Sequence, residues 1–161
     1  MFQLISALLI AALVGIDRVS KILAVNNLKD AQPVKFLFGA FQLRYTENTG
    51  AAFSAFSGNT AVLTVFTSLV ILLCLFVIFT RRVKSKFLCA CLIMVTAGGI
   101  GNLIDRFSQG YVVDFFEPLF MNFAVFNVAD IFITVGAFLL IGYEIYDLVK
   151  EKKSVKTSKN D

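Results

Sequence analysis

Two acidic residues, Asp114 and Asp130, are unusual because no lysine or arginine occurs anywhere in residues 108–143 around them. Two carboxyl groups that lie close together share one proton, because ionisation of the first opposes ionisation of the second. One member can then take a proton from water while the other polarises a carbonyl group. The pair therefore indicates acid–base hydrolysis, with an acid-lined path for cations as the alternative.

Several other chemistries lack the residues that they need. The chain has no histidine, which excludes Ser-His-Asp and Cys-His mechanisms and any His-ligated metal centre. The three cysteines, Cys74, Cys89 and Cys91, lie in apolar runs without the spacing of a zinc site, so we expect buried small hydrophobic side chains. We therefore expect no metal ion, no cofactor and no nucleic-acid partner.

The composition predicts membrane helices as the elements that must position these acids. Of the 161 residues, 58% are hydrophobic and 16% are charged, and the mean hydropathy is +0.80, whereas soluble domains carry about 25% charged residues. Four stretches have the roughly 20 apolar residues that a helix needs to cross a bilayer: 4–23, 61–79, 87–104 and 125–143. The sequence thus predicts an all-α membrane protein with four transmembrane helices in one domain, residues 1–150.

The basic residues predict how these helices are oriented. Nine of the 15 follow the second or the fourth stretch: Arg81, Arg82, Lys84, Lys86, Lys150, Lys152, Lys153, Lys156 and Lys159. The positive-inside rule then places both termini in the cytoplasm. The first stretch has no basic segment before it and no small-residue cleavage site, so we expect a retained helix rather than a signal peptide. Residues 151–161 are expected to form a basic, disordered cytoplasmic tail.

Polar residues converge at the outer ends of these stretches. Asp17 and Lys21 are four residues apart and share a helix face, and Asn127 and Asp130 are three apart. The other members of the set are Asn48, Asn102, Asp105, Arg106 and Asp114. Ionisable groups in a membrane face a partner or a water-filled cavity. The set is therefore either a polar site or a group of structural contacts, with Asp17 paired to Lys21 and Asp105 to Arg106 or another base.

The glycine-rich run AGGIGN gives a separate signal. Ala97 and Gly101 are four residues apart, a spacing of small residues that permits close helix packing. A phosphate-binding loop is excluded, because the run matches neither GxGxxG nor GxxxxGK[ST].

Four motifs occur in order between the apolar stretches: NTGAAF (48–53), GGIGNLIDR (98–106), VVDFF (112–116) and FNVADI (126–131). With the four stretches they resemble the bacterial lipoprotein signal peptidases, or signal peptidase II, over nearly the whole chain. The resemblance implies a small β-rich extracytoplasmic cradle and a surface helix between helices 1 and 2, at about residues 26–58. Ile131 departs from the pattern, which has a small residue such as Ser there.

The resemblance implies an aspartic endopeptidase of the bacterial cytoplasmic (inner) membrane. Such enzymes remove the signal peptide from diacylglyceryl-modified prolipoproteins by cutting before the lipidated cysteine. Asp114 and Asp130 would be the catalytic residues that activate water, and Asp17 and Lys21 would form a structural polar pair. The matching residues that would bind substrate or support the site are Asn48, Gly50, Asn102, Asp105, Arg106, Asn127 and Ala129. The expected partners are prolipoproteins and membrane lipids, with a monomeric enzyme and a site near the extracytoplasmic face.

Two other functions compete with this hypothesis. In a non-enzymatic ion path or scaffold, Asp17, Asp105, Asp114 and Asp130 would line a polar route. A metal-dependent lipid-modifying enzyme would use aspartates as magnesium ligands, but it would need clustered acidic motifs on the basic cytoplasmic side, where the sequence has none. Cleavage assays on proteins with Asn at position 114 or 130 distinguish these functions.

Overall fold

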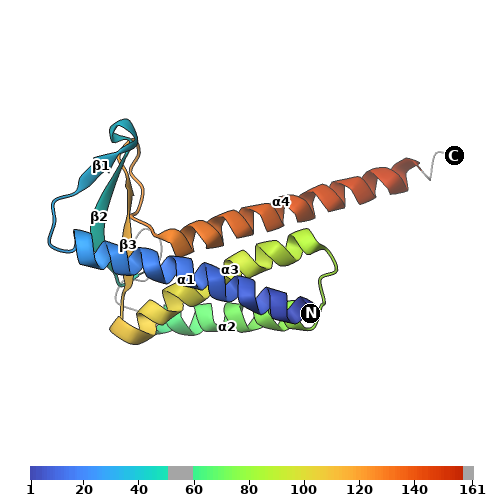
Figure 1. Ribbon diagram of the computed structural model, residues 1–161. Coiled ribbons are helices and arrows are strands. Elements are labelled where there is room, and N and C mark those ends of the chain that lie inside the picture. The colour runs from blue at the N-terminus through green and yellow to red at the C-terminus, as the bar shows by residue number, and fades with distance from the viewer. Residues whose placement is uncertain (51–59, 158–161) are drawn as a thin grey trace.

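The computed structural model describes residues 1–50 and 60–157, and within them the chain forms four α-helices, a short 3-10 helix and three strands. In chain order these are α1 (Phe2–Leu28), β1 (Val34–Phe36), η1 (Leu37–Gly39), β2 (Phe41–Asn48), α2 (Thr60–Phe79), α3 (Lys86–Gln109), β3 (Val112–Pro118) and α4 (Val128–Thr157). The strands lie at one end of the helices, while the N-terminus and the α2–α3 connection lie at the other end (Figure 1).

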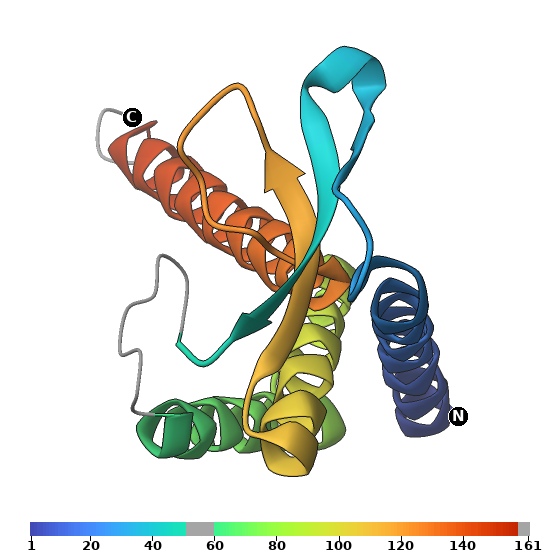
Figure 2. The ribbon, with the colours of Figure 1, turned by 90° about the vertical axis from the view of Figure 1, so that its left-hand side faces the viewer.

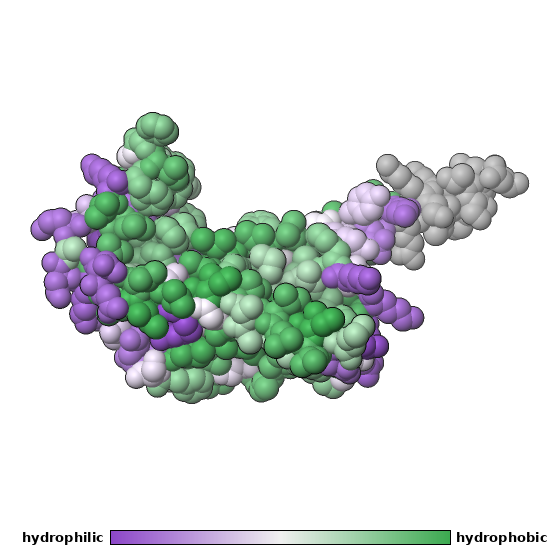
Figure 3. All heavy atoms as spheres, in the orientation of Figure 1, coloured by the Kyte–Doolittle hydropathy of each residue, from purple (hydrophilic) through white to green (hydrophobic). Residues whose placement is uncertain are grey.

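The fold is mainly helical, as the sequence predicts. Three of the described helices are long and apolar enough to cross a membrane: Thr60–Phe79, Lys86–Gln109 and Val128–Lys150. The helix α1 covers the predicted stretch 4–23 and carries charged residues in its second half. Hydrophobic residues cover the sides of the helices, and hydrophilic residues gather at the two ends of the molecule (Figure 3). This surface is that of a membrane protein.

The helix α3 is the centre of the bundle and contacts α1, α2 and α4 (Figure 2). Buried residues of α1, α2 and α3 form one core cluster: Ile10, Ile78, Cys89, Ile93 and Ala97. Close packing around AGGIGN is confirmed. A methyl group added at Gly98 would lie 2.3 Å from the carbonyl oxygen of Ala129 in α4, and one at Gly101 would lie 2.4 Å from Asp17 Oδ2 in α1. The cysteines are buried and free, as expected.

The three strands form one antiparallel sheet in the order β1-β2-β3, with Thr46 of β2 paired to Asp114 of β3. The prediction that the cradle lies between helices 1 and 2 is therefore incomplete, since β3 comes from the segment between α3 and α4. Gly110 ends α3 and lets the chain turn into β3. Its φ is left-handed, at 82°, and its N–H donates to the Arg106 carbonyl. Of the range 26–58 expected to hold the cradle and a surface helix, residues 51–58 lie outside the described residues, and the described part between α1 and β2 contains the short 3-10 helix η1.

The start of α4 is fixed by two residues that bond to each other reciprocally. The Asp130 N–H donates to Asn127 Oδ1 at 3.0 Å, and the Asn127 N–H donates to Asp130 Oδ2 at 3.1 Å. This is a capping box with Asp at its third helical position. The helix consequently begins at Val128 rather than at the predicted residue 125. It runs on to Thr157, and residues 158–161 of the expected tail lie outside the described residues.

Candidate active site

Asp114 is buried in the sheet, with 1% of its surface exposed, and both its oxygens accept hydrogen bonds from amides. Asn48 Nδ2 donates to Oδ2 at 2.8 Å, and Asn127 Nδ2 donates to Oδ1 at 2.6 Å. The register of β2 against β3 brings Asn48 to this position. Within residues 1–50 and 60–150, no lysine or arginine forms an ion pair with Asp114.

Asp130 lies in the first turn of α4, where the helix dipole favours a negative charge. Its Oδ1 accepts a hydrogen bond from Asn102 Nδ2 at 2.7 Å, and its Oδ2 accepts the Asn127 N–H. Asn127 therefore contacts both carboxyl groups, one with its side chain and one with its backbone. The structure brings the two acids together through this single residue.

Both acids line one cavity of about 470 Å³. Its apolar wall comes mainly from α4 and the segment before it: Phe123, Val125, Phe126, Ile131, Ile133 and Val135. Ile131, where the resemblance led us to expect a small residue, is part of this wall. A second hollow, of about 400 Å³, shares Asn48 and Asp114 but is lined by polar residues such as Arg44, Thr46 and Asn122. Asp114 thus stands between an apolar space and a polar one.

The environment of Asp114 favours its protonated form. Burial first, and then the negative charge of Asp130, raise the pKa of Asp114 to about 7. The hydrogen bonds from Asn48 and Asn127 and the charge of Lys21 act in the opposite direction. Near neutral pH this carboxyl group is therefore able both to donate and to accept a proton.

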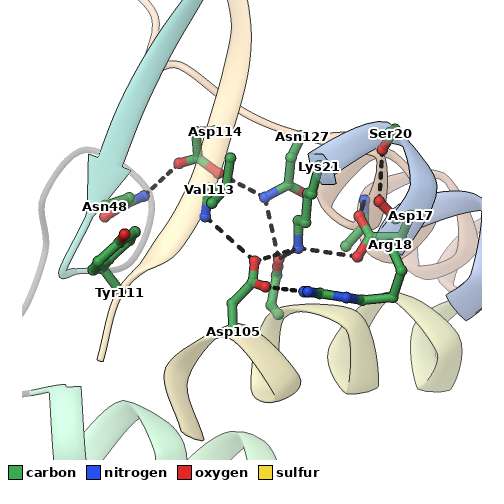
Figure 4. A network of polar contacts seen from close by, with 12 residues as sticks. Asp17, Arg18, Ser20, Lys21, Asn48, Asp105, Tyr111, Val113, Asp114 and Asn127 are labelled. Carbon is green, nitrogen blue, oxygen red and sulfur yellow. Dashed lines mark hydrogen bonds and ion pairs between the residues drawn. The ribbon is translucent and has the colours of Figure 1, made fainter. Parts of the chain in front are cut away.

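A second set of charged residues, which we call the ion-pair cluster, consists of Asp17, Arg18, Lys21 and Asp105 (Figure 4). Lys21 Nζ lies 3.0 Å from Asp17 Oδ2 and 2.9 Å from Asp105 Oδ2, and Arg18 pairs with Asp105 Oδ1. The Asp17–Lys21 pair is as predicted. Of the two partners that the sequence allowed Asp105, the structure selects the bases of α1 instead of Arg106.

The ion-pair cluster also holds the framework of the site. Asp17 Oδ1 accepts the Ala129 N–H of α4 at 2.9 Å, and Asp105 Oδ2 accepts the Val113 N–H of β3 at 3.3 Å. These contacts tie α1 and α3 to the two elements that carry Asp130 and Asp114.

Asn102 connects the ion-pair cluster to the two cavity acids. Its Oδ1 accepts hydrogen bonds from Lys21 Nζ at 2.9 Å and Asn127 Nδ2 at 3.1 Å, while its Nδ2 donates to Asp130. The amide orientation is set by this pattern, because only an oxygen can accept from a lysine.

The remaining predicted residues also lie at this end of the bundle. The Gly50 N–H donates to Asn48 Oδ1 at 2.9 Å, and the Gly50 carbonyl accepts from Arg106 Nη2 at 3.2 Å. Arg106 lines the cavity, and its buried Nε has no hydrogen-bond partner among the described residues. No group of three or more His, Cys, Asp or Glu side chains in the described chain is able to hold a metal ion.

Sequence reasoning missed two contributions to the site. Arg18 belongs to the ion-pair cluster, and its position one residue after Asp17 near the end of an apolar stretch was an available signal. Thr134 and Phe123 line the cavity. Neither of them carries a sequence signal that separates it from ordinary lipid-facing residues.

Fold and site together define a helical membrane protein with two carboxyl groups facing one cavity. The family model described as signal peptidase (SPase) II matches residues 9–146, so this chain belongs to the signal peptidase II family. The lipoprotein signal peptidase of Streptococcus thermophilus (strain CNRZ 1066) is 44% identical over 82% of this chain and 86% of its own. That of Enterococcus faecalis (strain ATCC 700802 / V583) is 38% identical over 95% of this chain and 92% of its own.

The fold is also similar to solved structures. A bacterial membrane enzyme structure obtained by the in meso method at 2.3 Å resolution matches with a TM-score of 0.82 and 26% identity, over 89% of this chain and 88% of that one. A second such structure, at 1.9 Å, matches with a TM-score of 0.78 and 26% identity, over 88% of this chain and 93% of that one.

Proposed function

We propose that this protein is the aspartic endopeptidase that removes signal peptides from diacylglyceryl-modified prolipoproteins, with Asp114 and Asp130 as its catalytic pair. One observation carries the assignment of the pair. The two carboxyl groups line one cavity, contact one asparagine and accept hydrogen bonds from amides, whereas Asp17 and Asp105 pair with bases. Membership of the signal peptidase II family supports the substrate class.

The surroundings of Asp114 suit a substrate that is part lipid and part peptide. The apolar cavity along α4 accommodates acyl chains or the hydrophobic end of the signal peptide, and the polar hollow accommodates peptide backbone. The bond to be cut then lies at the junction of the two spaces, beside both acids. Asn48 and Asn127 orient Asp114, and Asn102 orients Asp130.

In this mechanism Asp130 is the ionised member, because two donors and the N-terminus of α4 stabilise its charge. Asp130 takes a proton from water, the water oxygen bonds to the scissile carbonyl carbon, and Asp114 donates its proton to the carbonyl oxygen. Asp114 then takes a proton back from a hydroxyl of the tetrahedral intermediate as the C–N bond breaks. Asp130 transfers its proton to the leaving amine of the lipidated cysteine, which restores the resting pair.

The proposed topology has four transmembrane helices, with α1 as the first. Both termini and the basic α2–α3 connection lie in the cytoplasm, since positive residues favour that side. The sheet and the site then lie at the extracytoplasmic face, at the opposite end of the helices (Figure 1). The proposed working unit is a monomer, because one chain supplies both acids.

Cleavage of a purified, diacylglyceryl-modified prolipoprotein tests the assignment. Asp114→Asn and Asp130→Asn are each expected to lower kcat by about 10²- to 10⁴-fold or more, the range for loss of one acid–base group. Asp30→Asn is the matched control, because Asp30 is exposed and outside the site. Each protein is compared by thermal unfolding, so that a folding defect is separated from a chemical one.

The same assay separates the competing functions. Undiminished turnover by either Asn variant would remove that acid from the catalytic pair. Loss of activity on addition of EDTA would favour the metal-dependent enzyme, and a chain that cuts no prolipoprotein while conducting cations in vesicles would favour the ion path.

A further inference from the structure

The turn between β1 and β2 exposes large apolar side chains to an unusual degree. Three successive residues, Leu37, Phe38 and Gly39, have left-handed φ angles of 46°, 56° and 84°. That backbone conformation is unfavourable for Leu and Phe. It directs both side chains outward, so that Leu37 is 60% exposed and Phe38 is fully exposed. Leu37 and Phe38 therefore lie on the surface of this chain rather than in its core.

The loop after β3 adds to the same surface. The Leu119 N–H donates to the Ala40 carbonyl at 2.8 Å, and the ring of Phe120 packs edge-on against Phe41 at 5.5 Å. These contacts hold exposed residues of the loop beside η1. We call the combined surface the apolar tip: Val34, Leu37, Phe38, Leu119, Phe120 and Met121, all more than 40% exposed.

The apolar tip lies beside the helices and not over them. The sheet crosses the end of the bundle, and its hairpin projects sideways past the start of α4 (Figures 1 and 2). Because the helices run along the membrane normal, a sideways projection at their end lies over lipid. Hydrophilic residues gather on the end that faces away from the helices, whereas the tip is hydrophobic (Figure 3).

The loop that carries part of the tip leads into α4, a helix long and apolar enough to span a bilayer. Residues 122–127 connect Met121 to this helix, on which Phe138 is exposed. Lys35, exposed in β1 beside the tip, is positioned to meet lipid phosphates. Apolar residues with a flanking lysine are typical of a segment at a membrane interface.

We propose that the apolar tip inserts into the headgroup–acyl boundary of the outer leaflet and so fixes the height of the sheet at the membrane surface. Phe41, next to the tip, pairs with Pro118, and further along the same ladder Thr46 pairs with Asp114. A tip anchored in lipid thereby positions β3 relative to substrate held in the bilayer. The lipid contact is independent of the proposed function, whereas its effect on cleavage rests on that function.

A single-tryptophan probe tests the contact, because the chain contains no tryptophan. Full-length Phe38→Trp is reconstituted in vesicles of phosphatidylethanolamine and phosphatidylglycerol that carry bromine at defined acyl positions. We expect blue-shifted emission that is quenched most by bromines near the headgroup. Phe138→Trp on α4 is the lipid-exposed control, and Asp30→Trp, on the polar loop before β1, is the aqueous control.

Two results would overturn the insertion. Red-shifted, unquenched emission like that of Asp30→Trp would put the tip in water. Blue-shifted emission that brominated lipids do not quench would mean that protein covers the tip, for example a second copy of this chain.

Activity tests the positioning effect. We expect Phe38→Asp to lower kcat/KM for a lipid-modified prolipoprotein in vesicles by about fivefold, a part of what burial of a phenylalanine side chain supports. Phe38→Leu should retain the activity, and in detergent solution Phe38→Asp should match the unmodified protein. Equal activity in vesicles would refute positioning by the tip. A chain that is quenched at position 38 but cuts no prolipoprotein would refute the proposed function alone.

Discussion

The two groups of acids at this end of the bundle have opposite kinds of partner. Asp17 and Asp105 are fully buried, and each contacts the ammonium group of Lys21. Asp114 is as deeply buried, yet it and Asp130 are held by asparagine amides and backbone N–H groups. The first group pairs two acids with two bases, whereas neither acid of the second group forms an ion pair among the described residues.

The difference shows what each type of partner is suited to. A buried carboxylate paired to a base stays ionised and gives fixed contacts between helices. An amide donates a hydrogen bond without adding charge, so it orients an acid and leaves it free to change protonation. The ion-pair cluster is therefore suited to structure, and the pair of acids at the cavity to proton transfer.

Removal of Lys21 gives the largest expected effect on folding. In Lys21→Met two buried carboxylates lose a base, and loss of one partner from a buried ion pair destabilises by about 3–5 kcal/mol. The free energy of unfolding, measured by reversible unfolding in micelles, should fall by that amount. Lys29→Met is the matched control, since Lys29 pairs with Glu47 at 3.6 Å with both side chains nearly half exposed. Such pairs contribute about 0–1 kcal/mol.

If Lys21→Met were as stable as the unmodified protein, the ion-pair cluster would not have the structural role assigned to it. Asp17 and Asp105 would then stay buried without needing Lys21 as a partner. A stable but slow variant would instead assign Lys21 to the chemistry, through its hydrogen bond to Asn102.

Spacing along one element was enough to predict part of the site. Asp17 and Lys21 share a face because they are four apart on one helix, and the absence of lysine and arginine from residues 108–143 indicated that Asp114 has no basic partner nearby along the chain. The apolar stretches predicted the starts of α1, α2 and α3 to within two residues, and α4 begins three residues late, at Val128. The helix ends were predicted less well, because α1 and α3 each run five residues further and α4 runs 14 residues beyond residue 143.

Contacts between distant elements could not be predicted in the same way. Asp105 had a base next to it in Arg106, but its partners are Arg18 and Lys21, because helix packing decides which side chains meet. Asn48 reaches Asp114 only through the register of β2 on β3, and a shift of one residue would turn its side chain away. The third strand of the cradle was missed since it comes from elsewhere in the chain.

A smaller effect is expected when the ion-pair cluster is displaced sterically. In Gly101→Ala the new methyl group would lie 2.4 Å from Asp17 Oδ2, so α1 or the carboxyl group must move. We expect the free energy of unfolding to fall by about 1–3 kcal/mol, as for other overpacked sites. Gly15→Ala, which meets nothing within 4 Å, is the control and should leave stability unchanged or raise it. Equal stability of the two variants would show that the cluster tolerates displacement.

The smallest expected effect is a shift in the pH profile, and it tests the acids at the cavity directly. Because Asp114 donates its proton in the proposed mechanism and its pKa is about 7, kcat should fall as the pH rises above about 7. Asn48 donates to Asp114 and so stabilises the ionised form. In Asn48→Ala the pKa of Asp114 should therefore rise, and the alkaline limb should move to higher pH by about half a unit to one unit.

The control for this shift is Asn27→Ala, the same change at an exposed asparagine on α1 whose side chain donates to the Leu23 carbonyl. Its profile should match that of the unmodified enzyme. The informative contrary result is a shift of the acid limb with the alkaline limb fixed. Removal of Asn48 would then be acting on a base, so Asp114 would be the ionised member and Asp130 the proton donor. The difference between acids paired with bases and acids bonded to amides would remain. Within the catalytic pair, however, Asp114 and Asp130 would exchange the roles of proton donor and base.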